Sequence, residues 1–329
     1  MLSGFTARSE RWPLARPFRI SRGVRTETIV TVVEARVGDV VGRGESVPYA
    51  RYNETPESVL EQLTVLNRHP PSEVMRGRLS TLLPPGAARN AVDCALWDLE
   101  ARMAGKSVAQ ALGQTLPDSY ATAVTISIDT PDKMAEAARA VASSHVIKVK
   151  VDASQPRAII EAVAQAVPDA RLIIDPNESW NIELLRELQP FLAGLRVAFI
   201  EQPLPAAHDA ALETLKPLVA LCADESVHTS ADLEQVARRY QVINIKLDKT
   251  GGLTEALRLR AAARARNLQL MIGCMMCTSL SIAPALQIAA NADYADLDGP
   301  WWLAKDRDHG VHIDKGRLTL STPFLWGNQ

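Results

Sequence analysis

From about residue 118 to residue 300, the sequence repeats one unit: a short apolar or β-branched run, a polar turn, and an Ala/Leu-rich amphipathic helix. The candidate strands are residues 123–128, 146–151, 171–175, 197–201, 221–224, 242–247, 270–274 and 294–298. Strands that alternate with helices form right-handed βαβ units and a parallel sheet, and eight such units close a barrel. We therefore expect an α/β fold, a TIM-like (β/α)-barrel over residues 116–300. A doubly wound open sheet is the competing arrangement.

The first 115 residues have a different pattern. Residues 28–47 alternate like two antiparallel strands with a turn near Gly38-Asp39, and residues 56–67 and 88–104 place apolar groups at helical spacing before Gly105. A strand pair followed by helices predicts a small α+β domain over residues 1–115. Residues 301–329 contain no further strand–helix unit, and we expect them to return to that domain.

The net charge and the distribution of apolar residues argue against several classes of protein. A formal net charge of -2 argues against a nucleic-acid partner. No window approaches the roughly 18 consecutive apolar residues of a membrane span, and the charges and prolines of the first residues do not fit a signal peptide. These observations predict a cytoplasmic protein with no membrane partner. Cys274 and Cys277 form a CxxC, but without a second pair a zinc or redox site is not expected.

Charged residues gather where the candidate strands end. In a parallel barrel all these ends meet at one face, so their side chains converge although they are far apart in sequence. The residues concerned are Lys148, Lys150, Asp175, Asn177, Glu201, Asp224, Glu225, Lys246, Asp296 and Asp298.

Three of these residues predict a metal site. Asp175, Glu201 and Asp224 end three successive strands, and an all-oxygen set suits a hard cation such as Mg²⁺. Each carboxylate could instead cap the following helix. Three in succession beside lysines in apolar strands favour the metal, because a buried unpaired charge costs several kcal/mol.

The lysines predict acid–base chemistry. Lys148 and Lys150 are two residues apart and face the same side of a strand, and Lys246 enters from four strands further on. A lysine beside a cation and a second ammonium has its charged form disfavoured, so it can act as a general base. A metal-bound carboxylate would stabilise an enediolate, and bases on two faces would permit inversion.

At these positions the sequence resembles the enolase superfamily, in its muconate-lactonizing subgroup, over essentially the whole chain. The shared motifs are KxK at Lys148, DxN at Asp175, EQP at Glu201, DES at Asp224 and KxxKTGG at Lys246. The resemblance implies a capping domain on the barrel. It also implies Mg²⁺ held by Asp175, Glu201 and Asp224, Lys150 and Lys246 as bases, and Lys148 as an electrostatic helper. Lys249 is the rival for the second base. A lysine base acting with magnesium over an enediolate is the established chemistry of that superfamily.

A narrower resemblance is to dipeptide epimerases, particularly those that act on L-Ala-D/L-Glu in murein peptide recycling. It implies an isomerase working by two-lysine 1,1-proton transfer. In that group the DxD at Asp296 and Asp298 binds the α-ammonium of the dipeptide, and an arginine of the first capping loop binds the glutamate side chain. Arg22 and Arg25 are the two candidates for that arginine, and residues 49–55 would complete the lid.

Three other functions compete. o-Succinylbenzoate synthase and muconate cycloisomerase use the same lysines and metal for elimination or lactonisation, but have no evident need for Asp296 and Asp298. A non-catalytic metal-binding barrel is the third. Barrels of this type often form homo-oligomers, although no exposed stripe in the sequence predicts one.

Overall fold

The computed structural model describes residues 2, 4–70 and 72–327. Its largest sheet has eight strands in the order β12-β11-β10-β9-β8-β7-β6-β5, with every neighbouring pair parallel. The strands are β5 (Val124–Ile126), β6 (Val146–Lys150), β7 (Arg171–Asp175), β8 (Val197–Glu201), β9 (Leu221–Ala223), β10 (Val242–Ile245), β11 (Gln269–Gly273) and β12 (Tyr294–Asp296). The predicted barrel is confirmed, and the open doubly wound sheet is not found.

Contacts between the two edge strands close the barrel. The amide of Ala123 donates to the carbonyl of Ala295 over 2.8 Å, and the amide of Leu297 donates to the Thr122 hydroxyl over 2.9 Å. The predicted strand at 242–247 ends earlier, because Lys246 starts the helical turn α9 (Leu247–Thr250). The turn α9 therefore directly follows Lys246, one of the predicted site residues.

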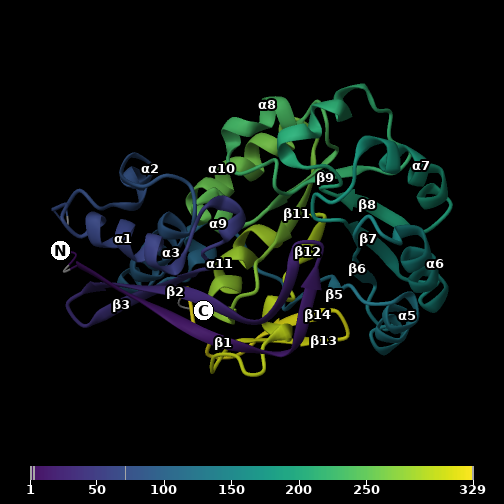
Figure 1. Ribbon diagram of the computed structural model, residues 1–329. Coiled ribbons are helices and arrows are strands. Elements are labelled where there is room, and N and C mark those ends of the chain that lie inside the picture. Colours follow the sequence, from purple (N-terminus) through teal and green to yellow (C-terminus); the bar gives the residue numbers. More distant parts are fainter. Residues whose placement is uncertain (1, 3, 71, 328–329) are drawn as a thin grey trace.

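Helices cover the outside of the barrel (Figure 1). They are α5 (Pro131–Ala140), α6 (Pro156–Ala166), α7 (Ile182–Ala193), α8 (Leu233–Val236), α10 (Leu253–Arg264) and α11 (Ser279–Ala289). After β8 the chain forms a 3-10 helix, Ala206–Thr214, where the sequence predicts an α-helix. Outward strand residues pack against the helices, while six side chains fill the barrel interior: Ala123, Ile173, Phe199, Cys222, Val242 and Met271.

The N-terminal part is a three-stranded antiparallel sheet packed on helices. The strands are β1 (Gly4–Ile20), β2 (Gly23–Val37) and β3 (Val40–Ser46), and the helices are α1 (Pro56–Leu66), α2 (Leu79–Leu82), α3 (Ala87–Ala104) and α4 (Val108–Ala111). The predicted hairpin pairs β2 with β3, and α3 ends at Gly105 in the left-handed conformation. Strand β1 was not predicted, because its many charged residues mask the alternation.

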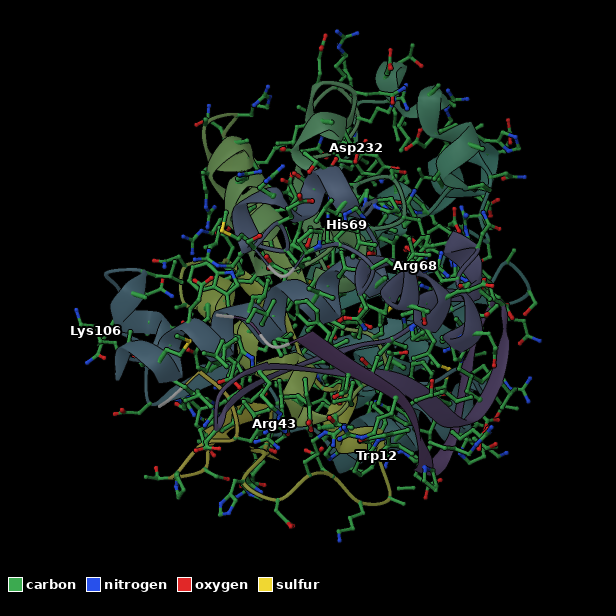
Figure 2. All side chains as sticks on the ribbon, turned by 90° about the vertical axis from the view of Figure 1, so that its left-hand side faces the viewer. Trp12, Arg43, Arg68, His69, Lys106 and Asp232 are labelled. Carbon is green, nitrogen blue, oxygen red and sulfur yellow. The ribbon has the colours of Figure 1, made fainter. Side chains whose placement is uncertain are left out.

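The C-terminal segment contacts both the barrel domain and the N-terminal domain. Strands β13 (Val311–Asp314) and β14 (Arg317–Leu320) form a small sheet with β4 (Ser119–Ala121). The Trp326 indole donates to the carbonyl of Cys94 on α3, and the Arg43 side chain donates to the carbonyl of Leu325. Arg43 is labelled in the lower part of Figure 2. The domain boundaries at residues 115 and 300 stay predictions, and residues 1, 3, 71, 328 and 329 lie outside the described part.

The N-terminal domain reaches over the end of the barrel where the strands terminate, which we call the mouth. Long strands β1 and β2 extend toward β5 and β12 (Figure 1), and the amide of Arg19 donates to the Ser127 hydroxyl over 2.7 Å. The turn between them continues to Ser21, whose hydroxyl donates to the carbonyl of Asn177. No helix in the described residues is long and apolar enough to cross a membrane.

Candidate active site

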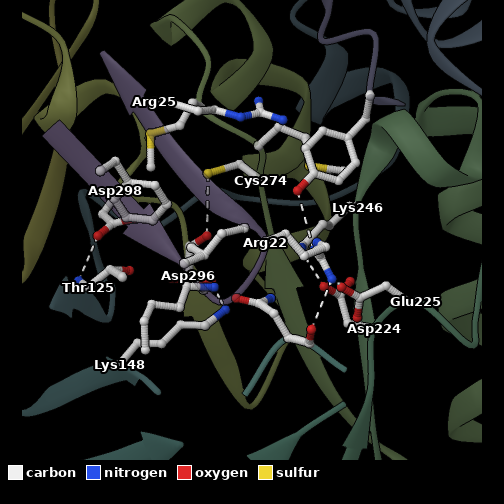
Figure 3. Close-up of a pocket in the computed structure, with 18 of the residues that line it drawn as sticks. Arg22, Arg25, Thr125, Lys148, Asp224, Glu225, Lys246, Cys274, Asp296 and Asp298 are labelled. Carbon is white, nitrogen blue, oxygen red and sulfur yellow. Dashed lines mark hydrogen bonds and ion pairs between the residues drawn. The ribbon is translucent and has the colours of Figure 1, made fainter. Parts of the chain in front are cut away.

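A cavity at the barrel mouth brings the predicted residues together (Figure 3). Its floor comes from the ends of barrel strands and includes Lys148, Lys150, Asp224, Lys246 and Asp296. Its roof comes from the N-terminal domain, with Phe18, Ile20, Arg22, Arg25, Tyr49 and Tyr52. The cavity therefore exists only where the two parts of the chain meet.

Lys148 is the centre of the buried charges. Its ammonium nitrogen lies 3.0 Å from Asp175 Oδ2, 2.6 Å from Glu201 Oε2 and 2.7 Å from Asp296 Oδ2. Asp175 also pairs with Lys150, at 2.5 Å. Asp175 and Glu201 are fully buried beneath the lysines, so each needs a cation close by.

Asp224 binds the two remaining lysines. Its Oδ2 lies 2.6 Å from Lys246 Nζ, and its Oδ1 lies 2.7 Å from Lys249 Nζ. Lys246 lines the cavity, whereas Lys249 is buried below it and donates to the Asn244 carbonyl over 2.9 Å. Of the two candidates for the second base, Lys246 is the one that lines the cavity.

The carboxyl groups differ in their pKa values. Burial opposes ionisation of Asp175 and Asp224, but lysines outweigh it and hold the pKa of each well below its usual range. Burial and the repulsion of Asp175 raise the pKa of Glu201 to about 7. The ionised form of Glu201 is therefore stabilised less by its surroundings than the ionised forms of Asp175 and Asp224.

The protein groups alone raise the pKa of the lysines that face the cavity carboxylates, and the expectation of a lowered pKa for a lysine beside a bound cation stays a prediction. Burial would lower the pKa of Lys246, but Asp224 and Glu201 face it and raise that pKa above the usual range. Lys148 behaves in the same way, with Asp296, Glu201 and Asp175 around it. The direct pairing of each lysine with a carboxylate depends on the tertiary structure.

The acidic residues fit a hard divalent cation in their chemistry. Within the described ranges, no group of three acidic, histidine or cysteine side chains is arranged to hold a metal ion, and lysine ammonium groups stand between the carboxylates. Asp175 and Glu201 nevertheless converge on a single positive charge, that of Lys148. Around the mouth, six acidic residues are buried with four lysines, and Arg22 pairs with one of the acids, Glu225, so that carboxyl groups outnumber these cationic groups by one: Asp175, Glu201, Asp224, Glu225, Asp296 and Asp298, against Lys148, Lys150, Lys246, Lys249 and Arg22.

Asp296 and Asp298 have different surroundings. Asp296 Oδ2 pairs with Lys148, and its Oδ1 is buried with no hydrogen-bond partner among the described residues. Asp298 Oδ2 accepts from the amide of Thr125 over 2.7 Å and from the Trp302 indole over 3.4 Å. Burial and the charge of Asp296 raise the pKa of Asp298 to about 6. The Oδ1 oxygen of Asp296 is therefore left for a bound cation.

Arg22 and Arg25 also differ. Arg22 lies 2.9 Å from Glu225 and 3.2 Å from Glu178, and donates to the carbonyl of Asn177. Arg25 lies over the Tyr49 ring, 4.7 Å from its centroid. Figure 3 shows Arg25 on one side of the cavity and Lys148 and Asp224 on the other. Arg22 is occupied by protein acids, so Arg25 is the arginine available to an acidic ligand.

Gln202 supports the site, although the sequence marks it only as part of a motif. It follows Glu201, and its Oε1 accepts from the amides of Asp224 over 2.9 Å and Ser226 over 3.1 Å. Its Nε2 donates to the Tyr240 hydroxyl over 3.0 Å. The EQP motif is the sequence signal for Gln202, but the motif does not reveal its hydrogen-bond partners, which lie outside β8.

A capped (β/α)-barrel with buried carboxylates and facing lysines at its mouth is the architecture of an acid–base enzyme. Family models agree: residues 3–113 match the mandelate racemase/muconate lactonizing enzyme N-terminal domain, and residues 133–323 match the enolase C-terminal domain-like family. The chain belongs to this mandelate racemase/muconate lactonizing enzyme family of the enolase superfamily.

Three known proteins are similar over nearly the full length. The L-Ala-D/L-Glu epimerase of Escherichia coli is 48% identical, over 94% of this chain and 98% of that protein. An enolase family member from Agrobacterium tumefaciens, solved with sodium and L-Ala-L-Glu, has a TM-score of 0.95 and 45% identity, covering 98% of this chain and 99% of that one. A dipeptide epimerase from Methylococcus capsulatus, solved with Mg and L-Arg-D-Lys, has a TM-score of 0.88 and 32% identity, covering 99% and 98%.

Proposed function

We propose that this protein is a magnesium-dependent dipeptide epimerase that interconverts L-Ala-L-Glu and L-Ala-D-Glu. The observation that carries the proposal is the placement of Lys150 and Lys246 in one cavity. They end β6 and follow β10, which are four strands apart in the sheet order of an eight-stranded barrel. Two amines from nearly opposite sides suit proton removal on one face of a carbon and proton return on the other.

The roles of the lysines follow from their contacts. Lys150 and Lys246 both line the cavity and are each 8% exposed, so each can reach the α-carbon of the second residue of a dipeptide. Lys148 is 1% exposed and is held among three carboxylates. We assign it an electrostatic role beside the substrate carboxylate.

Asp175, Glu201 and Asp224 would hold the magnesium ion, since they are buried oxygen donors at successive strand ends. The bound ion would supply positive charge beside the substrate carboxylate and so favour loss of the neighbouring proton. Relatives solved with a cation and a dipeptide support a bound cation as the cofactor.

Two groups account for the L-Ala-Glu substrate. The free Oδ1 of Asp296 matches the α-ammonium of the first residue, because a buried carboxylate oxygen gains most from a charged donor. The Arg25 guanidinium, across the cavity, matches the side-chain carboxylate of glutamate. We assign Asp298 to the support of this end of the site, through Thr125 and Trp302.

Deuterium exchange tests the proposal directly. The protein is incubated with Mg²⁺ and L-Ala-L-Glu in D₂O, and the α-proton of the second residue is followed by NMR. We expect loss of that proton signal together with the appearance of L-Ala-D-Glu. Unchanged dipeptide would refute the function, and conversion of an o-succinylbenzoate precursor or of muconate in parallel reactions would identify the rival chemistry.

The remaining sequence-based predictions stay predictions. A cytoplasmic location is supported by the four cysteines, Cys94, Cys222, Cys274 and Cys277, which are all free thiols. We also propose that the protein forms a homo-oligomer, by analogy with other barrels of this type.

A further inference from the structure

The short turn α9 directly follows Lys246 and is buried against the N-terminal domain. Asp248 is 4% exposed, and Lys249 and Thr250 are even less so. The carbonyl of Lys246 accepts the amides of both Lys249 and Thr250 over 3.0 Å. The backbone of Lys246 is therefore part of this turn, and whatever holds the turn also holds Lys246.

One carboxylate oxygen connects the turn to two parts of the N-terminal domain. Asp248 Oδ1 accepts from the Val47 amide over 2.9 Å and from the Asn90 side-chain amide over 2.8 Å. Val47 begins the segment that leads to Tyr49, a residue of the cavity roof. Asn90 is a fully buried residue of α3.

Helix α3 makes a second set of contacts with the same segment. Arg89 donates to the carbonyl of Thr250 over 2.7 Å and to that of Gly251 over 3.2 Å. A Cβ on Gly251 would lie 2.3 Å from Arg89 Nε, and a Cβ on Gly252 would lie 2.4 Å from Asp93 Cβ. Both glycines also have positive φ, of 71° and 111°. The glycine pair of the KTGG motif thus permits close approach of α3.

We propose that Asp248 is a positioning residue for Lys246, through which the N-terminal domain sets the location of the second base. This inference rests on the proposed function. Lys150, by contrast, is held in the ladder between β6 and β7. Loosening the α9 turn should therefore displace one base and spare the other.

This difference between the bases makes the inference testable. Misplacement of a reacting group by 1 Å can cost about 10²-fold in rate. Each lysine removes the α-proton of one epimer, so a displaced Lys246 should slow exchange from that epimer alone. A general loss of stability should slow exchange from both epimers equally.

The experiment compares Asp248→Ala, Asp248→Asn and a matched control, Asp98→Ala. Asp98 is also a buried acid that accepts backbone amides, those of Arg43 and Gly327, but it lies away from the α9 turn. Circular dichroism first establishes that each variant is folded. Exchange of the α-proton in D₂O is then measured separately from L-Ala-L-Glu and from L-Ala-D-Glu.

We expect Asp248→Ala to slow exchange from one epimer by about 10²-fold relative to the other. Asp248→Asn should restore near-normal exchange, because its Oδ1 can accept the same two hydrogen bonds. Asp98→Ala should keep the wild-type ratio. Equal slowing of both epimers by Asp248→Ala, no slowing, or the same asymmetry in Asp98→Ala would overturn the inference.

A readout without catalysis separates this inference from the proposed function. If the wild-type protein exchanges neither epimer, the proposed substrate is wrong, and Asp248 is judged by backbone hydrogen exchange. The amides of Lys249, Thr250 and Gly251 should then exchange about tenfold faster in Asp248→Ala than in Asp98→Ala. Equal protection in the two variants would rule out a positioning role.

Discussion

The ammonium nitrogen of Lys148 lies 2.7 Å from Asp296 Oδ2, although the two residues are 148 positions apart in the chain. They meet because the barrel closes between β5 and β12, with β6 next to β5. The contact uses one oxygen of Asp296 and leaves Oδ1 without a hydrogen-bond partner in the described structure. This geometry, rather than the DxD motif, distinguishes Asp296 from Asp298.

Replacement of Asp296 by Asn should weaken binding of the dipeptide. A hydrogen bond to a charged group contributes about 1.5–3 kcal/mol, so Kd should rise roughly 10- to 100-fold. Calorimetric titration with L-Ala-L-Glu measures the change, and Asp298→Asn is the matched control. A larger effect on Kd from Asp298→Asn would mean that the ammonium site has been assigned to the wrong carboxylate.

Replacement of Arg25 by Met should change substrate preference. The variant loses the charge that pairs with glutamate, so kcat/KM for L-Ala-L-Glu should fall about 10²-fold, while the neutral L-Ala-L-Gln should change little. Arg22→Met should reduce turnover of both dipeptides, because Arg22 pairs with Glu225. If Arg22→Met were the variant selective for L-Ala-L-Glu, the two arginines would have to exchange roles.

Removal of either base should affect the epimers in opposite ways. Lys150→Ala should abolish α-proton exchange from one epimer of L-Ala-Glu, and Lys246→Ala should abolish it from the other. Loss of the general base should cost at least about 10²-fold. Both variants should stay folded by circular dichroism. Full exchange in Lys246→Ala but not in Lys249→Ala would move the second base to Lys249.

Magnesium should stabilise the protein against heat. A ligand that binds only the folded state at 100 times its Kd adds about 2.7 kcal/mol, which corresponds to several degrees in Tm. EDTA should remove both this shift and the activity, and Mg²⁺ should restore both. Asp224→Ala should show no shift with Mg²⁺. An unchanged shift in that variant would exclude Asp224 as a ligand.

The stability of the protein should depend on pH through Asp248. Burial raises the pKa of Asp248 to about 7 from its usual 3.8. A raised carboxyl pKa favours the folded state fully below pH about 4, and this contribution is lost as the pH rises toward 7. Between pH 5 and pH 8 the loss should be on the order of 2 kcal/mol.

Chemical denaturation of Asp248→Asn tests this pH dependence. The variant keeps a neutral side chain, so its free energy of unfolding should fall less between pH 5 and pH 8 than that of the wild-type protein. Identical pH profiles would show that Asp248 does not titrate in this range.

The sequence by itself determined the barrel and most of its strands. Residues 171–175 and 197–201 are predicted and observed with the same bounds, because strands buried on both sides must be continuous apolar runs. The sequence also predicts that the charged residues lie together at the barrel mouth, since all strands of a parallel barrel end on the same face. Strand β1 is not predicted from the sequence, because its many charged residues mask the alternation of buried and exposed positions.

Only the tertiary structure decided how those charges are used. The predicted strand ends place Lys148, Asp296 and Asp224 at one face of the barrel, but they do not show which carboxylate oxygen remains free or which lysine lines the cavity. The same holds for Asp248, whose partners Val47 and Asn90 lie 201 and 158 residues away. A sequence pattern reports periodicity along one segment, whereas these pairings depend on how two domains pack, and packing is set by contacts between distant segments.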